Sequence, residues 1–306
     1  MLKIMVLKHL SELKELLVDK PTRRMALAAA QDHNSLTSAL MAARDGFIEP
    51  ILIGDKEAIQ KIASDNDLDL AGVRLIHEPD TEMSVEIAVK MVRSNQADIL
   101  MKGKVGTSSL LKAVLNKEWG LRSGALLSHF AIFEVEAYHK LIAVTDVAMN
   151  IAPNLADKIA IVNNSVACLN KLGVEIPKVA VLGAVEMVSE NMQATLDAAL
   201  LSKMNQRDQI RNCIIDGPLA FDNAISLESA NHKNIKSSVA GDTDLLLMPD
   251  IEVGNVLYKS LVFFAHAGVA AVILGATAPI VLTSRSDSDQ AKYYSILLAA
   301  AITRPL

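Results

Sequence analysis

The chain has 306 residues, which is enough for one large domain or two moderate domains, each with its own core. Hydrophobic residues make up 51% and aromatic residues only 4%, so the core must consist of Ala, Val, Ile, Leu and Met, which suits a helix-covered parallel sheet. With 30 basic and 35 acidic residues the net charge is −5, and the absence of a basic stripe makes nucleic acid an unexpected partner.

The first seventeen residues carry lysines and glutamates at helical spacing and have no small-residue cleavage site after a long apolar run. This segment predicts an amphipathic helix rather than an export signal. No stretch of about 18 consecutive apolar residues occurs along the chain, so a membrane span is not expected either. We therefore expect a cytoplasmic protein.

Short apolar runs alternate with longer segments of helical period, which is the pattern of an α/β fold with mainly parallel strands. In such folds ligands bind at the carboxyl ends of the strands, so the loops that follow strands are the first candidates for a site. The predicted strands are 24–29, 49–53, 97–101, 141–145, 178–182, 212–215, 245–248 and 269–274. The predicted helices are 36–45, 84–94, 108–115, 156–172, 189–204, 255–266 and 290–301.

The loop after the predicted strand 97–101 reads KGKVGTSS and offers glycines for close backbone approach, lysines for charge, and hydroxyls where a helix begins. Its order matches neither a Walker loop nor a GxGxxG motif. From these residues alone, a phosphate site and a capped turn between strand and helix are equally good interpretations. The candidate anion-binding residues are Lys102, Gly103, Lys104, Gly106, Thr107 and Ser108.

Two further polar loops follow predicted strands. Asp216 opens an Asp-Gly-Pro turn, for which a purely structural role is favoured. The segment 249–255 contains Asp250 and Asn255 and precedes a helix that bears Lys259. These residues predict the polar edge of a cleft.

The segment 283–289 reads TSRSDSD and directly follows an apolar run. Its single guanidinium suits bidentate recognition of phosphate and stabilisation of an oxyanion. A neighbouring aspartate could accept a proton, and a serine could donate a hydrogen bond. Spacing alone, however, favours a solvated start of the helix 290–301.

Other chemistries lack their signatures. The seven histidines never fall at the spacing of a local metal motif, although ligands from distant segments could still come together. There is no GxSxG elbow, and Cys168 and Cys213 lie in apolar surroundings that predict reduced core thiols. A covalent acyl-enzyme is therefore disfavoured.

Four blocks of the chain, in this order, resemble the phosphate acetyl/butyryltransferase family, and most closely its phosphate butyryltransferase branch. The resemblance spans nearly the whole chain, and four ordered blocks are far more specific than one motif. The blocks are ADILMKGKVGTSS (97–109), DGPLAFDNAI (216–225), PDIEVGNVLYKS (249–260) and APIVLTSRSDS (278–288).

The resemblance implies two doubly wound α/β domains with mainly parallel sheets, like those of isocitrate and isopropylmalate dehydrogenases, with the active site in the interdomain cleft. Residues 1–130 with 278–306 would form one domain and 131–277 the other. The implied reaction moves a short acyl group between coenzyme A and phosphate by direct attack in a ternary complex. Its partners are acyl-CoA, coenzyme A, phosphate and acyl phosphate, with no metal or bound organic cofactor, and the subunits form a homodimer or larger homo-oligomer.

The resemblance also assigns roles to residues. Ser284 and Arg285 match the Ser-Arg pair that stabilises the transferring group in the acetyl members. The aspartate that receives the thiol proton there corresponds to Ala291, so Asp289 is predicted as the base in preference to Asp287, which is assigned to substrate binding. Alternatives are a phosphate acetyltransferase, a metal- and NAD-dependent dehydrogenase of the same fold, and a non-catalytic acyl-CoA-binding module.

Overall fold

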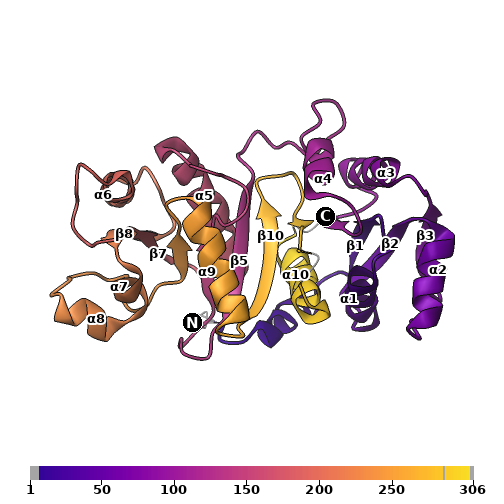
Figure 1. Cartoon of the computed structure of the whole chain (residues 1–306), viewed down its shortest axis with the longest axis horizontal. Coiled ribbons are helices and arrows are strands. Elements are labelled where there is room, and N and C mark those ends of the chain that lie inside the picture. Colours follow the sequence, from indigo (N-terminus) through magenta and orange to yellow (C-terminus); the bar gives the residue numbers. More distant parts are fainter. Residues whose placement is uncertain (1–6, 285–286, 304–306) are drawn as a thin grey trace. The chain divides into compact units, whose positions relative to one another are not determined.

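A computed structural model describes residues 7–284 and 287–303 of the chain (Figure 1). The chain divides into two compact units. The terminal unit comprises Ser11–Ala125 and the part of the chain from Ala270 onward, and the central unit comprises Leu126–Val269 and the segment that ends at Leu10. The family resemblance implies domain boundaries at residues 130 and 278.

The terminal unit is a doubly wound sheet whose strand order is β3-β2-β1-β4-β11-β10. All neighbouring pairs in this order are parallel except β10 with β11. Its strands are β1 (Arg23–Ala28), β2 (Ile48–Gly54), β3 (Arg74–His77), β4 (Ile99–Lys102), β10 (Gly268–Leu274, which starts at the unit boundary) and β11 (Ile280–Val281). Its helices are α1 (His33–Arg44), α2 (Lys56–Asp65), α3 (Thr81–Arg93), α4 (Thr107–Val114) and α10 (Asp289–Ile302).

Helices cover both faces of this sheet. Figure 1 shows α3 and α4 on one side of the strands and α1 with α10 on the other. Side-chain oxygens accept hydrogen bonds from backbone N–H groups at most of the helix starts and so fix where those helices begin, as Asp32 does for α1 and Ser288 for α10. The start of α4 is an exception, because its N-cap is Gly106.

The strands of the central unit follow the order β5-β6-β9-β7-β8, in which only β5 and β6 run antiparallel. Its strands are β5 (Ser128–Glu134), β6 (Ile142–Thr145), β7 (Lys178–Leu182), β8 (Ile214–Leu219) and β9 (Leu245–Leu247). Its helices are α5 (Leu155–Lys171), α6 (Gln193–Gln206), α7 (Phe221–Ile225), α8 (Leu227–His232) and α9 (Ile251–Phe263).

The predicted α/β fold with mainly parallel strands is confirmed, and each predicted strand is present. The pattern missed β3, β5 and β11 and the helices α2, α7 and α8. The predicted N-terminal helix is wrong over the described part of that segment, which forms two short 3-10 helices, η1 (Leu10–Leu13) and η2 (Glu15–Leu17). The leucines at helical spacing are buried as expected, but their burial fixes the segment without a continuous helix.

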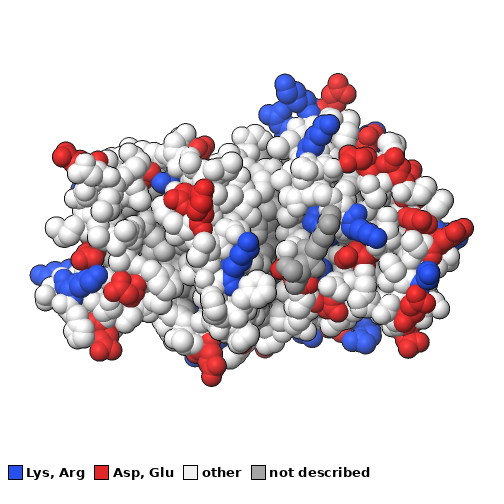
Figure 2. Space-filling model, viewed as in Figure 1, with Lys and Arg blue, Asp and Glu red and all other residues white. Residues whose placement is uncertain are grey.

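No helix among the described residues is long and apolar enough to cross a membrane. On the face drawn in Figure 2, acidic and basic side chains are scattered among uncharged residues, and the basic ones form no stripe.

Candidate functional site

Three loops of the terminal unit meet at one edge of its sheet. Strands β1, β4 and β11 are parallel neighbours, so their carboxyl ends lie together. Each is followed by a helix start, namely that of α1, α4 or α10. Asp32 and Ser288 cap the starts of α1 and α10, whereas the start of α4 has no side-chain cap. The free N–H groups and the positive dipole end of α4 therefore suit this edge to bind an anion.

The loop after β4 packs tightly against the end of β1. The N–H of Gly103 donates to the Ala28 carbonyl at 2.8 Å, and the N–H of Lys104 donates to the Ala29 carbonyl at 2.8 Å. A Cβ on Gly103 would overlap the Ala29 carbonyl oxygen and lie 2.7 Å from that of Ala28, so only glycine fits. This contact fixes the loop at the carboxyl edge.

The six predicted anion-binding residues of this loop divide into two groups. Lys102 is buried, and its Nζ donates to the carbonyls of Gly103 (3.1 Å) and Val105 (3.4 Å), so it supports the loop from behind. Gly103 is likewise buried, whereas the other four lie at or just before the uncapped start of α4, and three of these are exposed: Lys104, Thr107 and Ser108. The exposed group can contact a ligand directly.

The loop after β11 holds Ser284 by both of its peptide groups. The N–H of Ser284 donates to Oδ2 of Asp287 at 2.7 Å, and its carbonyl accepts from Nζ of Lys292 at 2.7 Å. Lys292, on α10, also donates to Oγ1 of Thr283 at 3.2 Å. We call Thr283, Ser284, Asp287 and Lys292 the Ser284 cluster. The predicted catalytic Arg285 lies outside the described residues.

Charges around the Ser284 cluster influence one another. Burial raises the pKa of Asp287, whereas the hydrogen bond from Ser284 and the charges of Lys292 and Lys102 act in the opposite direction. Burial lowers the pKa of Lys292, against the effect of Asp287, Asp32 and Asp289. Carboxylates and ammonium groups therefore lie behind an exposed Ser284 in one electrostatic cluster.

Asp289 is the first residue of α10, and its carboxylate differs from that of Asp287 in its hydrogen bonds. Its Oδ1 is buried and has no hydrogen-bond partner among residues 7–284 and 287–303. A buried carboxylate oxygen without a partner is costly unless something else binds there. Asp287, by contrast, uses Oδ2 to accept from Ser284.

The predicted site residues of the central unit have local contacts of their own. Oδ1 of Asp216 accepts from the N–H of Gly217, and Asp250 caps α9. Nδ2 of Asn255 donates to the Val147 carbonyl at 3.4 Å, and Lys259 is exposed on α9. Asp250 and Asn255 thus meet at the start of α9, whereas Asp216 lies on the edge strand β8.

Sequence reasoning missed a buried cluster after β6. Asp146 is 3% exposed and accepts hydrogen bonds from the backbone of His129 and Ala148 and from the side chain of Asn150. Nδ1 of His129 is buried without a partner among the described residues, and burial lowers the pKa of this imidazole, which the charge of Asp146 partly offsets. No spacing in the sequence signals this cluster.

The cysteines are poor nucleophiles. Both are free and buried, and burial raises the pKa of Cys168 to about 12 and that of Cys213 to about 11. A thiol becomes reactive mainly as its thiolate, so neither is prepared to carry an acyl group. In the described part of the chain, no group of three His, Cys, Asp or Glu could hold a metal ion.

The chain is similar to known acyltransferases over most of its length. Residues 82–300 match the family described as Phosphate acetyl/butaryl transferase. A phosphate butyryltransferase of Clostridium beijerinckii is 45% identical over 96% of this chain and 98% of its own length. A phosphate acetyltransferase of Thermotoga maritima is 42% identical over 91% of this chain and 94% of its own length.

Solved structures agree with this similarity. A branched-chain phosphotransacylase from Enterococcus faecalis V583 superposes with a TM-score of 0.81 at 34% identity, covering 92% of this chain and 99% of that one. A 4-hydroxythreonine-4-phosphate dehydrogenase from Klebsiella pneumoniae reaches a TM-score of 0.58 at 12% identity, covering 92% of this chain and 100% of that one. The second match concerns the fold alone, and it agrees with the predicted likeness to dehydrogenase folds.

Proposed function

Since the chain belongs to the phosphate acetyl/butyryltransferase family, we propose that it transfers a short acyl group, preferably butyryl, reversibly between coenzyme A and inorganic phosphate. The observation that carries this proposal is the 45% identity, over nearly the full length of both chains, to a protein named phosphate butyryltransferase. The exposed Ser284, with ammonium groups behind it, supports an anionic substrate at the same edge. Coenzyme A and acyl-CoA are substrates, and no metal or bound organic cofactor takes part.

The reaction proceeds by direct attack in a ternary complex. In the direction of acyl-CoA synthesis, the sulfur of coenzyme A attacks the carbonyl carbon of the acyl phosphate. The carbon–sulfur bond forms, the bond from carbon to the phosphate oxygen breaks, and phosphate leaves. Ser284 donates a hydrogen bond to the reacting centre, and Arg285 binds the phosphoryl oxygens and the developing oxyanion.

The thiol proton passes to Asp289 and from there to the departing phosphate. A free thiol has a pKa of about 8.5, so its attack benefits from a proton acceptor within reach. Asp289 has a carboxylate oxygen without a hydrogen-bond partner among the described residues, which supports its assignment over Asp287. The exposed start of α4 would bind phosphate groups of the substrates through Lys104, Gly106, Thr107 and Ser108.

Two amide substitutions test the assignment of the base. Asp289→Asn removes the proton acceptor and is expected to lower kcat by about 10²-fold. Asp287→Asn keeps an oxygen that can accept from the Ser284 N–H, so its effect on kcat should be about tenfold or less. Steady-state rates of both variants decide between them: a larger loss for Asp287→Asn would transfer the role to Asp287.

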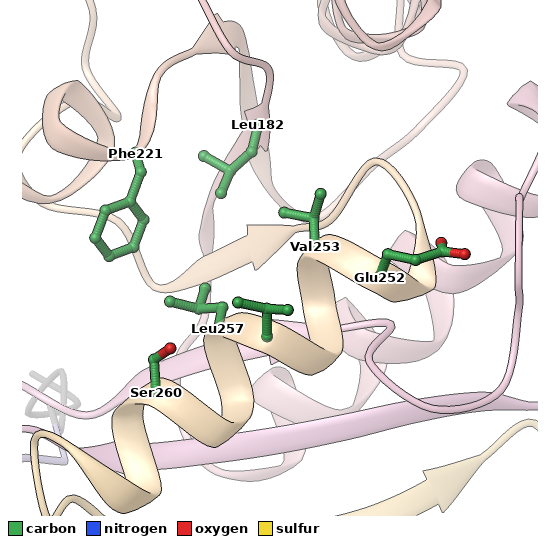
Figure 3. A pocket seen from close by; sticks show the side chains of 7 residues that line it. Leu182, Phe221, Glu252, Val253, Leu257 and Ser260 are labelled. Carbon is green, nitrogen blue, oxygen red and sulfur yellow. The ribbon is translucent and has the colours of Figure 1, made fainter.

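The protein is proposed to act in the cytoplasm as a homo-oligomer, and α9 is the proposed contact between subunits. This helix and the residue just beyond it expose four large apolar side chains: Val253 (45%), Val256 (65%), Phe263 (62%) and Phe264 (88%). Beside them a groove of about 450 Å³ is lined almost entirely by apolar atoms, with Leu182 and Phe221 facing α9 across it (Figure 3). Apolar surface of this kind favours burial against a partner.

The oligomer proposal has a direct test. Val256→Asp places a charge on the exposed face of α9 and should shift the molar mass measured by light scattering toward that of a monomer. Lys61→Glu changes an exposed position on α2; it is the matched control and should leave the mass unchanged. If the unmodified protein is already a monomer, the proposed contact is wrong.

Phosphate-dependent release of free thiol, measured with acyl-CoA substrates of two to six carbons in the presence of a chelator, tests the reaction itself. The proposal expects release that requires phosphate and is fastest with butyryl-CoA. The 42% identity to a phosphate acetyltransferase favours acetyl transfer as the second candidate, which a peak at acetyl-CoA would support. Binding of coenzyme A without any release would instead indicate a binding module.

A further inference from the structure

We propose that Lys292 is a positioning residue of the transfer reaction, which together with Asp287 clamps the backbone on both sides of Ser284 and so fixes the position from which the serine hydroxyl reaches the substrate. This inference rests on the proposed function, because it concerns the residue that would stabilise the transferring group. Neither Lys292 nor a clamp of this kind is visible as a motif in the sequence.

The geometry of the clamp is complete within the described residues. Asp287 accepts from the Ser284 N–H at 2.7 Å, and Nζ of Lys292 donates to the Ser284 carbonyl at 2.7 Å. Hydrogen bonds to ionised groups are shorter and stronger than neutral ones, and here one lies on each side of the same Cα. The backbone of Ser284 is therefore fixed while its side chain stays exposed.

Lys292 holds this position from inside the protein. The residue is only 2% exposed, and its two hydrogen-bonded partners are neutral oxygens, the Thr283 hydroxyl and the Ser284 carbonyl. Burial of an ammonium group is costly, and an apolar side chain of similar length would fill the same space. The hydrogen bonds of Lys292 go to Thr283 and Ser284, in the loop that carries the proposed catalytic residues.

A fixed serine matters for the rate. A hydrogen-bond donor accelerates a reaction when it is already aimed at the charge that develops, and a displacement of about 1 Å can lower the rate by about 10²-fold. Loss of the clamp should therefore lower kcat and leave substrate binding largely intact. Lys292 is too buried to bind a substrate phosphate itself.

A double-mutant cycle on kcat separates positioning from structural support. Lys292→Met should lower kcat by about 10²-fold, with KM for acyl-CoA and phosphate changed by less than threefold. In the background of Ser284→Ala, the same substitution should lower kcat by less than threefold, because the hydroxyl that Lys292 positions is already gone. The same substitution at the exposed Lys61 is the control and should leave kcat unchanged.

Several outcomes would overturn the inference. Equal losses of kcat in both backgrounds, a loss confined to KM for phosphate, or unchanged kcat in a folded Lys292→Met protein would each do so. If Lys292→Met does not fold, Thr283→Val removes one hydrogen-bond acceptor of the ammonium, and its loss of kcat must likewise vanish in the Ser284→Ala background. Activity of the unmodified protein is measured first, so failure of the proposed function would be recognised separately.

Discussion

Two buried lysines, one in each unit, are held in different ways. Lys158 on α5 is 4% exposed, and its ammonium group pairs with Asp197 on α6 at 2.6 Å. The other carboxylate oxygen of Asp197 accepts from Gln193 at 2.8 Å. Lys292 is equally buried, but it donates to a hydroxyl and a carbonyl of the loop at the sheet edge.

The comparison shows that burial of a charge does not by itself mark a functional residue. The Lys158–Asp197 pair joins two helices, and each charge compensates the other. Lys292 instead orders the loop that carries the exposed Ser284. The hydrogen-bonding partner, rather than the depth of burial, distinguishes the two roles.

The largest effect is expected from breaking the pair in the central unit. Lys158→Met leaves Asp197 as a buried charge without its ammonium partner, which should lower the free energy of unfolding by about 3–5 kcal/mol. The kcat of the folded fraction should be unchanged. Chemical denaturation measures the first quantity, and replacing both partners (Lys158→Met with Asp197→Leu) should recover most of the loss.

The next largest effect is expected at the two residues proposed to stabilise the transferring group. Ser284→Ala and Arg285→Ala should each lower kcat by about 10²-fold or more, which is about 2.7 kcal/mol of transition-state stabilisation. Their thermal unfolding temperatures should stay close to that of the unmodified protein, in contrast to Lys158→Met. Steady-state kinetics would contradict these roles if only the Michaelis constants rose.

A pair of glycine substitutions tests how tightly the loop after β4 is held at the edge of the terminal unit's sheet. Gly103→Ala places a Cβ against the carbonyls of Ala28 and Ala29 and should cost about 1–3 kcal/mol of stability, with a loss of activity. Gly106→Ala is the matched control for stability, because its Cβ would approach no atom beyond its chain neighbours closer than 3.7 Å and its φ is −68°. Thermal unfolding of both variants would show whether the loop tolerates the first change.

The smallest effect is expected from a half-exposed charge cluster in the central unit. Burial raises the pKa of Asp242, but hydrogen bonds from Lys140, Lys178 and His139 outweigh it and hold the pKa below its ordinary value of 3.8. Because the folded pKa is the lower one, the charged carboxylate stabilises the fold at pH above about 4 and loses this contribution as the pH falls further.

Asp242→Asn should therefore reduce stability by about 1 kcal/mol at pH 7, since solvent screens a side chain that is 45% exposed. The difference in unfolding free energy between the two proteins should shrink as the pH falls below about 4. A difference that stays constant from pH 7 to pH 3 would contradict the assignment of the lowered pKa to Asp242.

Much of the fold could be predicted from the sequence, because alternating apolar runs and helical periods identify β1, β4, α4 and α10 directly. Two of the missed strands carry weak local signals. None of the residues of β3 is fully buried, and β11 is only two residues long, so pairing with β4 rather than an apolar pattern defines it as a strand. The predicted N-terminal helix failed because burial of its leucines did not require helical hydrogen bonds.

Many residues of the candidate site could also be predicted from the sequence, but their contacts with one another could not. The sequence indicated Lys102, Ser284, Asp287 and Asp289, since polar loops after strands are the sites of α/β proteins. It could not separate Lys102, which supports its loop from inside, from the exposed Lys104. It also gave no reason to choose Lys292 or the buried Asp146, whose contacts depend on the folded backbone.

The sequence by itself determined the α/β class, the family and the loops that carry chemistry, because these follow from local periodicity and from ordered motifs. The tertiary structure decided which groups face one another. The parallel pairing of β1, β4 and β11 brings three loops to one edge, and α10 then places Lys292 beneath Ser284. Hydrogen bonds and electrostatic fields act over a few ångströms in space, and separation along the chain does not encode that distance.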